Sequence, residues 1–260
     1  MCSSRSPTGA NTARTAPPEF TGGRKQKVNG KGGLLWTVDV YKRQEKRHIV
    51  CFGDSNTHGY RASDDGRYDE QERWTCLLQK QLGDDYLIIE EGLSGRTTCF
   101  SDPIHEGLSG LDYIYPCLMS HEPVDLLVIM LGTNDTKERF GASAACIALG
   151  LKRLIAKAAS TFDAWRTGRA NILVVTPKSI DKRYEATQVG KTMGMGCAEK
   201  SEGLAQEFEG IASQMGCHYL DANTVVTEQN HYDFMHLTKE GHQELADALA
   251  EVISSLFNSQ

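Results

Sequence analysis

Five short apolar runs recur along the chain from residue 48 onward, and turn-forming residues such as Gly, Asp and Asn flank them. Runs of this length and composition are typical of buried β-strands, because a buried helix needs more residues. The pattern predicts strands at residues 48–52, 86–90, 125–131, 171–176 and the less apolar 217–220.

Between these runs, apolar residues recur every three or four positions, which is the period of an amphipathic helix. In the first such segment Trp74 and Leu78 share one face, and Gly83 follows as a C-terminal cap. In the last segment Thr238 stands where it can cap a stripe that includes Leu249. The spacing predicts helices at residues 72–82, 144–158, 201–216 and 238–257.

The alternation of strands with helices predicts an α/β fold. Units of this kind form a parallel sheet with right-handed crossovers and helices on both faces. In such a fold the ligand site lies beyond the carboxyl ends of the strands. Polar residues that directly follow the predicted strands are therefore the first candidates for function.

The first 46 residues differ from the rest. They are rich in Ser, Thr, Pro, Gly and basic residues and show no hydrophobic period up to the strand-like segment LLWTVDVYKRQ. We expect residues 1–46 to be a disordered or non-native leader and residues 47–260 to form one domain. The leader holds nine Lys and Arg against three Asp and Glu, which gives it a net charge of +6. Because the whole chain has a net charge of −6, residues 47–260 have a net charge of −12.

Composition narrows the class of protein. Hydrophobic residues make up 40% of the 260 positions, and the longest apolar run, residues 126–131, is too short to cross a bilayer. We therefore expect no membrane partner. The acidic domain also argues against nucleic acid, which attracts clustered positive charge. A small-molecule substrate is the expected partner.

The eight cysteines are scattered, with no Cys-x-x-Cys pair, and several lie in apolar stretches. This distribution favours reduced thiols in a cytoplasmic protein over a disulfide framework. No secretory signal sequence is visible at the N-terminus.

Four polar segments follow the predicted strands or precede the last predicted helix. They are GDSN at 53–56, GLSGRTT at 92–98, GTND at 132–135 and DFMH at 233–236. Because the carboxyl ends of parallel strands meet at one edge, we expect these segments to converge.

Their side chains match the needs of nucleophilic catalysis. A serine that attacks an acyl carbon needs a base, a carboxylate that orients this base, and donors for the developing oxyanion. Ser55, His236 and Asp233 can supply the first three parts, with Nδ1 of the imidazole facing the carboxylate. The Ser55 N–H, the Gly95 N–H and the Asn134 amide are the candidate oxyanion donors.

The four segments closely resemble the blocks that name the SGNH, or GDSL, hydrolase superfamily. Here the blocks read FGDSNTHG, GLSGRTT, LGTND and DFMHLTKEGH, in the order of that family. Phrases such as EEGLSGRTT and IMLGTNDTK are similar to the small bacterial arylesterase, acetylesterase and acyltransferase branch. The resemblance covers essentially residues 47–256.

The resemblance implies a flavodoxin-like three-layer α/β/α sandwich around a parallel five-stranded sheet. It implies Ser55, Asp233 and His236 as catalytic residues, Ser55, Gly95 and Asn134 as the oxyanion hole, and no metal or organic cofactor. It also implies a homo-oligomer, in that branch often an octamer.

The resemblance further suggests which residues contact substrate. Asn56 replaces the Leu of many members, and His58 stands where close relatives can carry an aromatic residue, so substrate preference cannot be transferred. The expected substrate-binding residues are Asn56, His58, Lys137 and Met235.

Other interpretations of the same residues remain open at this stage. Gly-Asp-Ser-Asn could be a plain turn or a helix cap. His231, Asp233 and His236 could bind a metal, although no fourth ligand is evident. Cys51 lies within a predicted strand, where a buried thiol is inert. A second EGLSG, at residues 106–110, is expected to be a loop.

We expect a serine esterase that acts on short acyl esters. Its physiological reaction could be deacetylation of carbohydrate, such as xylan oligosaccharides, or acyl transfer to another alcohol. A catalytically silent carbohydrate-binding protein and a metal-dependent hydrolase are the alternatives from other classes. Residues 178–196 form a variable stretch that could close over the site or mediate subunit contact.

Overall fold

A computed structural model describes residues 46–258 of the chain. These residues fall within one compact unit. The expected leader, residues 1–46, lies outside the described residues except for Lys46, so its nature stays a prediction.

The described residues contain a parallel five-stranded sheet with the strand order β4-β1-β5-β6-β7. This is the flavodoxin-like order, and the predicted fold class is confirmed. Gly53 at the end of β1 is paired with Gly92 of β4 on one side and Met130 of β5 on the other. The strands are β1 (Arg47–Gly53), β4 (Tyr86–Gly92), β5 (Leu126–Met130), β6 (Ile172–Thr176) and β7 (His218–Asp221).

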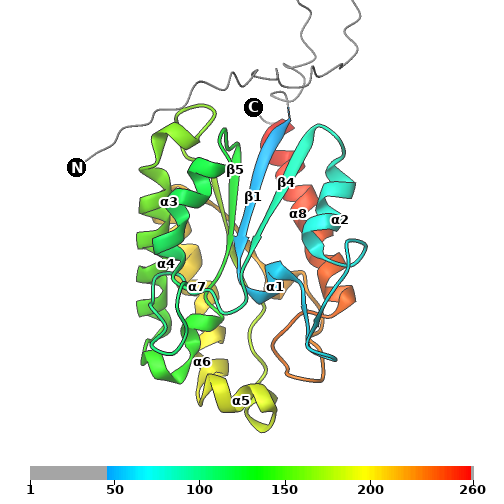
Figure 1. Ribbon diagram of the computed structural model, residues 1–260, viewed down its shortest axis with the longest axis vertical. Helices are drawn as coiled ribbons and strands as arrows, with labels where there is room; N and C mark the ends of the chain where they lie inside the picture. Colours follow the sequence, from blue (N-terminus) through cyan, green and yellow to red (C-terminus); the bar gives the residue numbers. More distant parts are fainter. Residues whose placement is uncertain (1–45, 259–260) are drawn as a thin grey trace, which may run out of the picture. The chain divides into compact units, whose positions relative to one another are not determined.

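Helices cover both faces of this sheet (Figure 1). On one face lie α2 (Trp74–Leu82) and α8 (Lys239–Asn258), and on the other lie α3 (Gly110–Ser120), α4 (Ala144–Ala159) and α7 (Leu204–Met215).

Alternation along β1 produces this division of the core. Ile49 and Cys51 pack toward α2 and α8, whereas Val50 and Phe52 pack toward α3, α4 and α7. All four of these side chains are fully buried. A strand whose residues are apolar on both faces is typical of a parallel sheet between two helical layers.

Shorter elements surround the carboxyl ends of the strands. They are α1 (Ser55–His58), β2 (Tyr60–Arg61), β3 (Gly66–Arg67), α5 (Gln188–Met193) and α6 (Cys197–Glu202), with the 3₁₀ turns η2 (Asn134–Thr136), η3 (Glu138–Phe140), η5 (Lys182–Ala186) and η6 (Ala222–Thr224). A further 3₁₀ turn, η4 (Phe162–Ala164), lies at the opposite edge, beside the start of β5.

Two helix predictions need correction. The second EGLSG is a loop only as far as Leu108, because Ser109 caps α3, which the sequence pattern missed. Pro116 lies inside this helix, and an internal proline normally argues against one. The predicted helix 201–216 is two helices, α6 and α7, which meet at Gly203.

Residues 178–196 pack against the domain through a few buried side chains. Tyr184 and Ile180 are buried in a small cluster with Met193 and Met235. The Tyr184 hydroxyl also donates to the Gly194 carbonyl oxygen at 2.7 Å. The segment therefore forms a fixed wall beside the loop that carries Met235.

The seven cysteines between residues 46 and 258 are all free. Within the same range, no helix has the length and apolar character that a membrane crossing requires.

Candidate active site

Ser55 lies where the first strand ends and α1 begins. Gly53 allows the helix to start so close to the strand, because a Cβ atom there would stand 2.0 Å from Thr57 Oγ1. Asp54 caps the helix by accepting a hydrogen bond from the Asn56 N–H at 3.0 Å. Ser55 is thereby fixed at the first helical position and is 8% exposed.

His236 connects Ser55 with Asp233. Its Nε2 lies 2.8 Å from Ser55 Oγ, and its Nδ1 lies 2.5 Å from Asp233 Oδ2. The ring of Tyr60 packs against the imidazole, with 4.5 Å between the two centroids. The structure therefore brings together the three residues predicted as nucleophile, base and orienting carboxylate, in the order that a triad requires.

The loop that carries Asp233 and His236 is held from two sides. Within it, Asn230 Nδ2 donates to Asp233 Oδ1 at 2.8 Å and to the His236 carbonyl oxygen at 2.6 Å. From outside, the Leu237 N–H donates to Asn56 Oδ1 at 2.9 Å. Because Asn56 adjoins Ser55 in α1, this bond links the loop of the base directly to the helix of the nucleophile.

Asp233 is an ionised carboxylate in this environment. Burial alone would raise its pKa, but hydrogen bonds from His236 and Asn230 outweigh burial and lower the pKa to about 2. The charge is thus present throughout the pH range in which an imidazole changes its protonation state. A permanent negative charge at Nδ1 stabilises the imidazolium that forms when His236 takes a proton.

Asn134 follows β5 and lies close to the nucleophile's segment. Its side chain is 7% exposed, and Nδ2 donates to Asp54 Oδ2 at 3.4 Å. A side-chain amide has two N–H donors, so the second can serve a substrate oxygen. Burial raises the pKa of Asp54, which is fully buried between α1 and this amide.

Gly95 lies in the turn after β4, with a φ of +89° that favours glycine. The turn is joined to the end of β1 by two hydrogen bonds to the Gly53 carbonyl oxygen. The Leu93 N–H donates at 3.1 Å, and Arg96 Nη1 donates at 3.1 Å.

Asp135 connects this turn with the segment of Asn134. Its Oδ1 accepts from the Thr98 N–H at 2.9 Å and from Thr98 Oγ1 at 2.5 Å. Asp135 is fully buried, and burial raises its pKa to about 6. The two predicted oxyanion donors outside α1 therefore stand on segments that are bonded together, and their role in catalysis stays a prediction.

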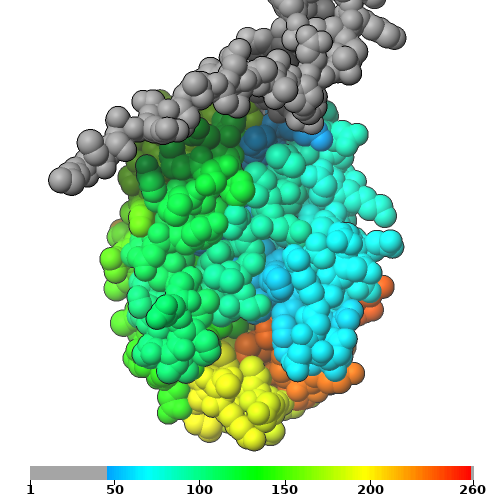
Figure 2. Space-filling view, viewed as in Figure 1, coloured from blue at the N-terminus to red at the C-terminus, as the bar shows by residue number. Residues whose placement is uncertain are grey.

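A cavity of about 260 Å³ adjoins the triad through Asp233, whereas Ser55 and His236 do not line it. Three segments line it, namely the stretch after α1, the beginning of α5 and the loop before α8. Figure 2 shows these segments in cyan, yellow and orange at the same end of the domain. The lining residues are Tyr60, Ala62, Asp65, Thr187, Gln188, Val189, Thr192, Tyr232 and Asp233.

None of the four predicted substrate-binding residues lines this cavity. Asn56 and Met235 are each 3% exposed, the first bonded to Leu237 and the second packed beneath η5 and α5. Lys137 is 7% exposed, with Nζ 3.8 Å from Asp102 Oδ2, and burial lowers its pKa. His58 is half-buried at the end of α1.

This placement favours supporting roles for Asn56 and Met235. Contact between substrate and any of the four residues stays a prediction.

Sequence reasoning missed several residues that shape the site. Asp54 belongs to the quoted block but was given no role, and its position before a four-residue helix is a capping signal. Asn230 and Tyr60 carry no recognisable motif, because their contacts with Asp233 and His236 depend on the folded loop. Arg96 follows Gly95 directly, and a basic residue in a strand-end turn is by itself uninformative.

The contacts of His236 and Cys51 exclude two alternative assignments. His236 uses both ring nitrogens for Ser55 and Asp233, and His231 is exposed with its ring against Phe234, so a metal site of His231, Asp233 and His236 does not form. Cys51 is fully buried, and burial raises the pKa of its thiol, which keeps it protonated as expected.

Comparison with known protein families is decisive at this point. The model of the GDSL-like lipase/acylhydrolase family matches residues 51–244, which include the segments of Ser55, Gly95, Asn134 and His236. The chain belongs to this family. The resemblance predicted from the four blocks is thereby confirmed, and this GDSL-family protein is a carboxylic ester hydrolase.

Solved structures place the chain within a bacterial branch of the family. The aryl esterase of M. smegmatis is 36% identical, with a TM-score of 0.75 over 81% of this chain and 99% of that one. A carbohydrate acetylesterase from Sinorhizobium meliloti is 35% identical, with a TM-score of 0.73 over 81% and 100%.

A putative arylesterase from Agrobacterium tumefaciens is 29% identical, with a TM-score of 0.73 over 80% of this chain and 99% of that one. A sequence search of curated proteins gives no match.

The low pKa of Asp233 predicts a pH-dependent contribution to the stability of this GDSL-family esterase. Because the pKa falls from 3.8 to about 2 on folding, ionised Asp233 stabilises the fold above about pH 4, and this contribution disappears as the pH falls toward 2. We expect Asp233→Asn to lower the free energy of unfolding at neutral pH by roughly 2 kcal/mol. The difference from the wild type should shrink between pH 4 and pH 2.

Urea denaturation at a series of pH values measures this difference. Asp163→Asn, which alters an exposed carboxylate in η4, is the matched control. A difference between wild type and Asp233→Asn that stays constant over the acidic range would contradict the assigned role of the hydrogen bonds to Asp233.

Proposed function

We propose that the protein hydrolyses short-chain acyl esters through an acyl-enzyme intermediate on Ser55. The observation that carries this proposal is the continuous chain of contacts from Ser55 Oγ to His236 Nε2 and from His236 Nδ1 to Asp233. A turn or a helix cap requires no such chain. Membership of the GDSL family and the esterase neighbours support the same assignment.

In the first half of the reaction, Ser55 Oγ attacks the carbonyl carbon of the ester while His236 Nε2 takes the hydroxyl proton. The bond between the carbonyl carbon and the alcohol oxygen then breaks, and His236 returns the proton to that oxygen. In the second half, a water molecule attacks the acyl carbon, gives its proton to His236 and releases the acid. Ser55 regains its proton from His236 as the acyl bond breaks.

Each tetrahedral intermediate carries a negative oxygen that needs preorganised donors. We assign this role to the Ser55 N–H, the Gly95 N–H and Asn134 Nδ2. Support comes from the bonds that hold their segments together, through Asp54 to Asn134 and through Asp135 to Thr98. Donors held in this way need little rearrangement when charge develops.

We propose acetyl esters as the substrate class, and the similarity to a carbohydrate acetylesterase of Sinorhizobium meliloti supports this choice. The cavity of about 260 Å³ beside Asp233 is lined by neither Ser55 nor His236, so we assign it to the alcohol portion of the ester rather than to the acyl group.

For the alcohol portion we propose a carbohydrate. The cavity presents hydroxyl and amide groups from Thr187, Thr192 and Gln188, which can hydrogen-bond to sugar hydroxyls. Tyr232 is 63% exposed at its rim and offers an aromatic face to a sugar ring. The similarity to a carbohydrate acetylesterase of Sinorhizobium meliloti supports this choice.

Acyl transfer to an alcohol uses the same intermediate and differs only in the second nucleophile. Such transfer stays a prediction, as do assembly into a homo-oligomer and location in the cytoplasm. Seven free thiols among residues 46–258 support the last of these, because thiols persist in a reducing compartment.

Replacement of the nucleophile tests the mechanism. We expect Ser55→Ala to lower kcat for p-nitrophenyl acetate by a factor on the order of 10⁴ or more, with the fold retained, because the covalent step is lost. The exposed Ser213→Ala in α7 is the control and should hydrolyse at the wild-type rate. Both variants are assayed with p-nitrophenyl acetate, butyrate and octanoate in the presence of EDTA.

A steep fall in kcat/KM with acyl length would support the preference for short acyl groups. Full activity in Ser55→Ala would refute the serine mechanism, and activity that EDTA abolishes would favour a metal-dependent hydrolase. If neither the wild type nor the control turned over any ester, the silent binding protein would replace the proposed enzyme.

The carbohydrate assignment predicts a selective effect at the rim of the cavity. We expect Tyr232→Ala to lower kcat/KM for acetylated xylo-oligosaccharides about tenfold, the effect of roughly 1.4 kcal/mol of lost ring contact, with little change for p-nitrophenyl acetate. Tyr115→Ala removes an exposed tyrosine from α3 and serves as the control. Equal loss on both substrates, or on neither, would contradict a sugar subsite at Tyr232.

A further inference from the structure

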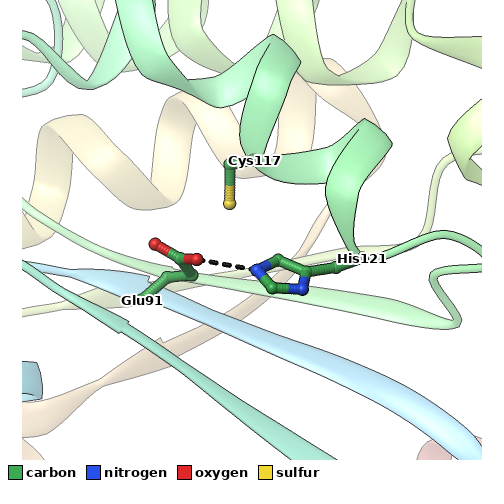
Figure 3. A group of neighbouring side chains, drawn as sticks. All are labelled: Glu91, Cys117 and His121. Atoms are coloured by element: carbon green, nitrogen blue, oxygen red, sulfur yellow. Dashed lines mark hydrogen bonds and ion pairs between the residues drawn. The ribbon is translucent and has the colours of Figure 1, made fainter. Parts of the chain in front are cut away.

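A second group of chemically reactive side chains lies on the other side of β1 from α2 and α8. Glu91 near the end of β4, Cys117 in α3 and His121 at the end of α3 each direct one potential ligand atom to a common point (Figure 3). These three atoms lie within 4.8 Å of one another. The figure shows Cys117 Sγ directed toward the Glu91 carboxylate and the His121 imidazole, which are hydrogen-bonded to each other.

Secondary structure accounts for this convergence. Cys117 and His121 are four positions apart along α3 and its cap, so their side chains lie on the same face. Glu91 lies two positions after Ile89 in β4, so both side chains point to the same face of the sheet. Ile89 packs against the core on the side of α3. Glu91 therefore points toward the helix, and Oε1 reaches His121 Nε2 at 2.7 Å.

We propose that Glu91, Cys117 and His121 form a binding site for a divalent cation of the Zn²⁺ type. Thiolate, imidazole and carboxylate are the ligands that zinc takes in proteins, and three protein ligands leave a fourth position for water. The side chains of Glu91 and His121 are 16% and 26% exposed, so that water and the ion can enter from solvent.

The distances allow coordination after small side-chain rotations. Ligand atoms around tetrahedral zinc stand roughly 3.3–3.8 Å apart, as bond lengths of about 2.0–2.3 Å require. The Glu91–His121 contact of 2.7 Å must open slightly, and Cys117 Sγ lies within 4.8 Å of both ligand atoms. Because Glu91 and His121 are only partly buried, such rotations need no change in the backbone.

The charges around the group favour a site with two anionic ligands. Arg96 Nη2 lies 4.0 Å from Glu91 Oε2, and an uncompensated cation beside it would be repelled. A divalent ion held by one thiolate and one carboxylate forms a group with no net charge, once the Cys117 thiol has released its proton to solvent. Because Glu91 is already anionic, binding raises the local charge by one unit rather than two. Tyr113 donates a long hydrogen bond of 3.5 Å to Glu91 Oε1, which would be replaced by the ion.

This site is separate from the catalytic one. Ser55, Asp233 and His236 contribute no ligand to it, and Arg96 contacts both Glu91 and the Gly53 carbonyl oxygen. The three ligands are distant in sequence apart from the Cys117–His121 pair, which explains why no spacing signal indicated a metal. Without an ion, the group is a His–Glu hydrogen bond beside a buried thiol.

Titration of the full chain with Co²⁺, after treatment with chelator and dialysis, tests the proposal. Co²⁺ replaces Zn²⁺ in such sites and reports thiolate coordination by a sulfur-to-cobalt charge-transfer band together with visible d–d bands. We expect one equivalent to produce both features and Zn²⁺ to displace them. Cys117→Ser should abolish the charge-transfer band, and His121→Ala should weaken binding at least about tenfold.

Two matched variants control for cations bound elsewhere. Cys146→Ser removes an exposed thiol in α4, and His105→Ala removes an exposed histidine, so both should leave the spectrum and the affinity unchanged. Circular dichroism confirms the fold of each variant, and because His121 lies at a helix end, its replacement leaves the core intact. Absence of a charge-transfer band in the wild type, or a band that survives in Cys117→Ser, would overturn the proposal.

Discussion

One hydrogen bond, between Ser55 Oγ and His236 Nε2, joins residues 181 positions apart in sequence, and the whole active site depends on it. This bond of 2.8 Å can form only if the end of β1 and the loop before α8 are held in a fixed position relative to each other. Gly53 meets this demand on the first side, because its missing side chain lets α1 start directly at the strand end. Asn56 meets it on the second side by binding the Leu237 N–H.

The rest of the site consists of buried polar contacts that fix these segments. Asp54 joins α1 to Asn134, and Asp135 joins the turn of Gly95 to η2. Buried carboxylates are costly unless they are hydrogen-bonded, so each of these contacts restricts the conformations available to the strand ends. Rigidity of this kind is what nucleophilic catalysis requires, because donors and base must be in place before charge develops.

The sequence was sufficient for the sheet, for most of the helices that cover it and for the convergence of Ser55, Asp233 and His236, for identifiable reasons. Apolar runs bounded by turns predicted the strands. Ser55, Asp233 and His236 stand in sequence blocks whose residue types indicate nucleophilic catalysis before the fold is known. It was insufficient where contacts alone give a residue its role. Pro116 lies inside α3, and a proline normally argues against a helix, so this helix was not predicted. Asn230 belongs to no motif. The position of Glu91 beside α3 depends on which face of β4 its side chain occupies.

The most direct test of the central claim is covalent labelling with diethyl p-nitrophenyl phosphate, followed by intact mass measurement and peptide mapping. The reagent phosphorylates an activated serine and releases p-nitrophenol. The account predicts one diethylphosphoryl group per chain, located on Ser55, with loss of esterase activity in proportion to labelling and no labelling in His236→Ala. Inactivation with the label on any other residue, or full labelling of His236→Ala, would contradict the proposal that His236 activates Ser55.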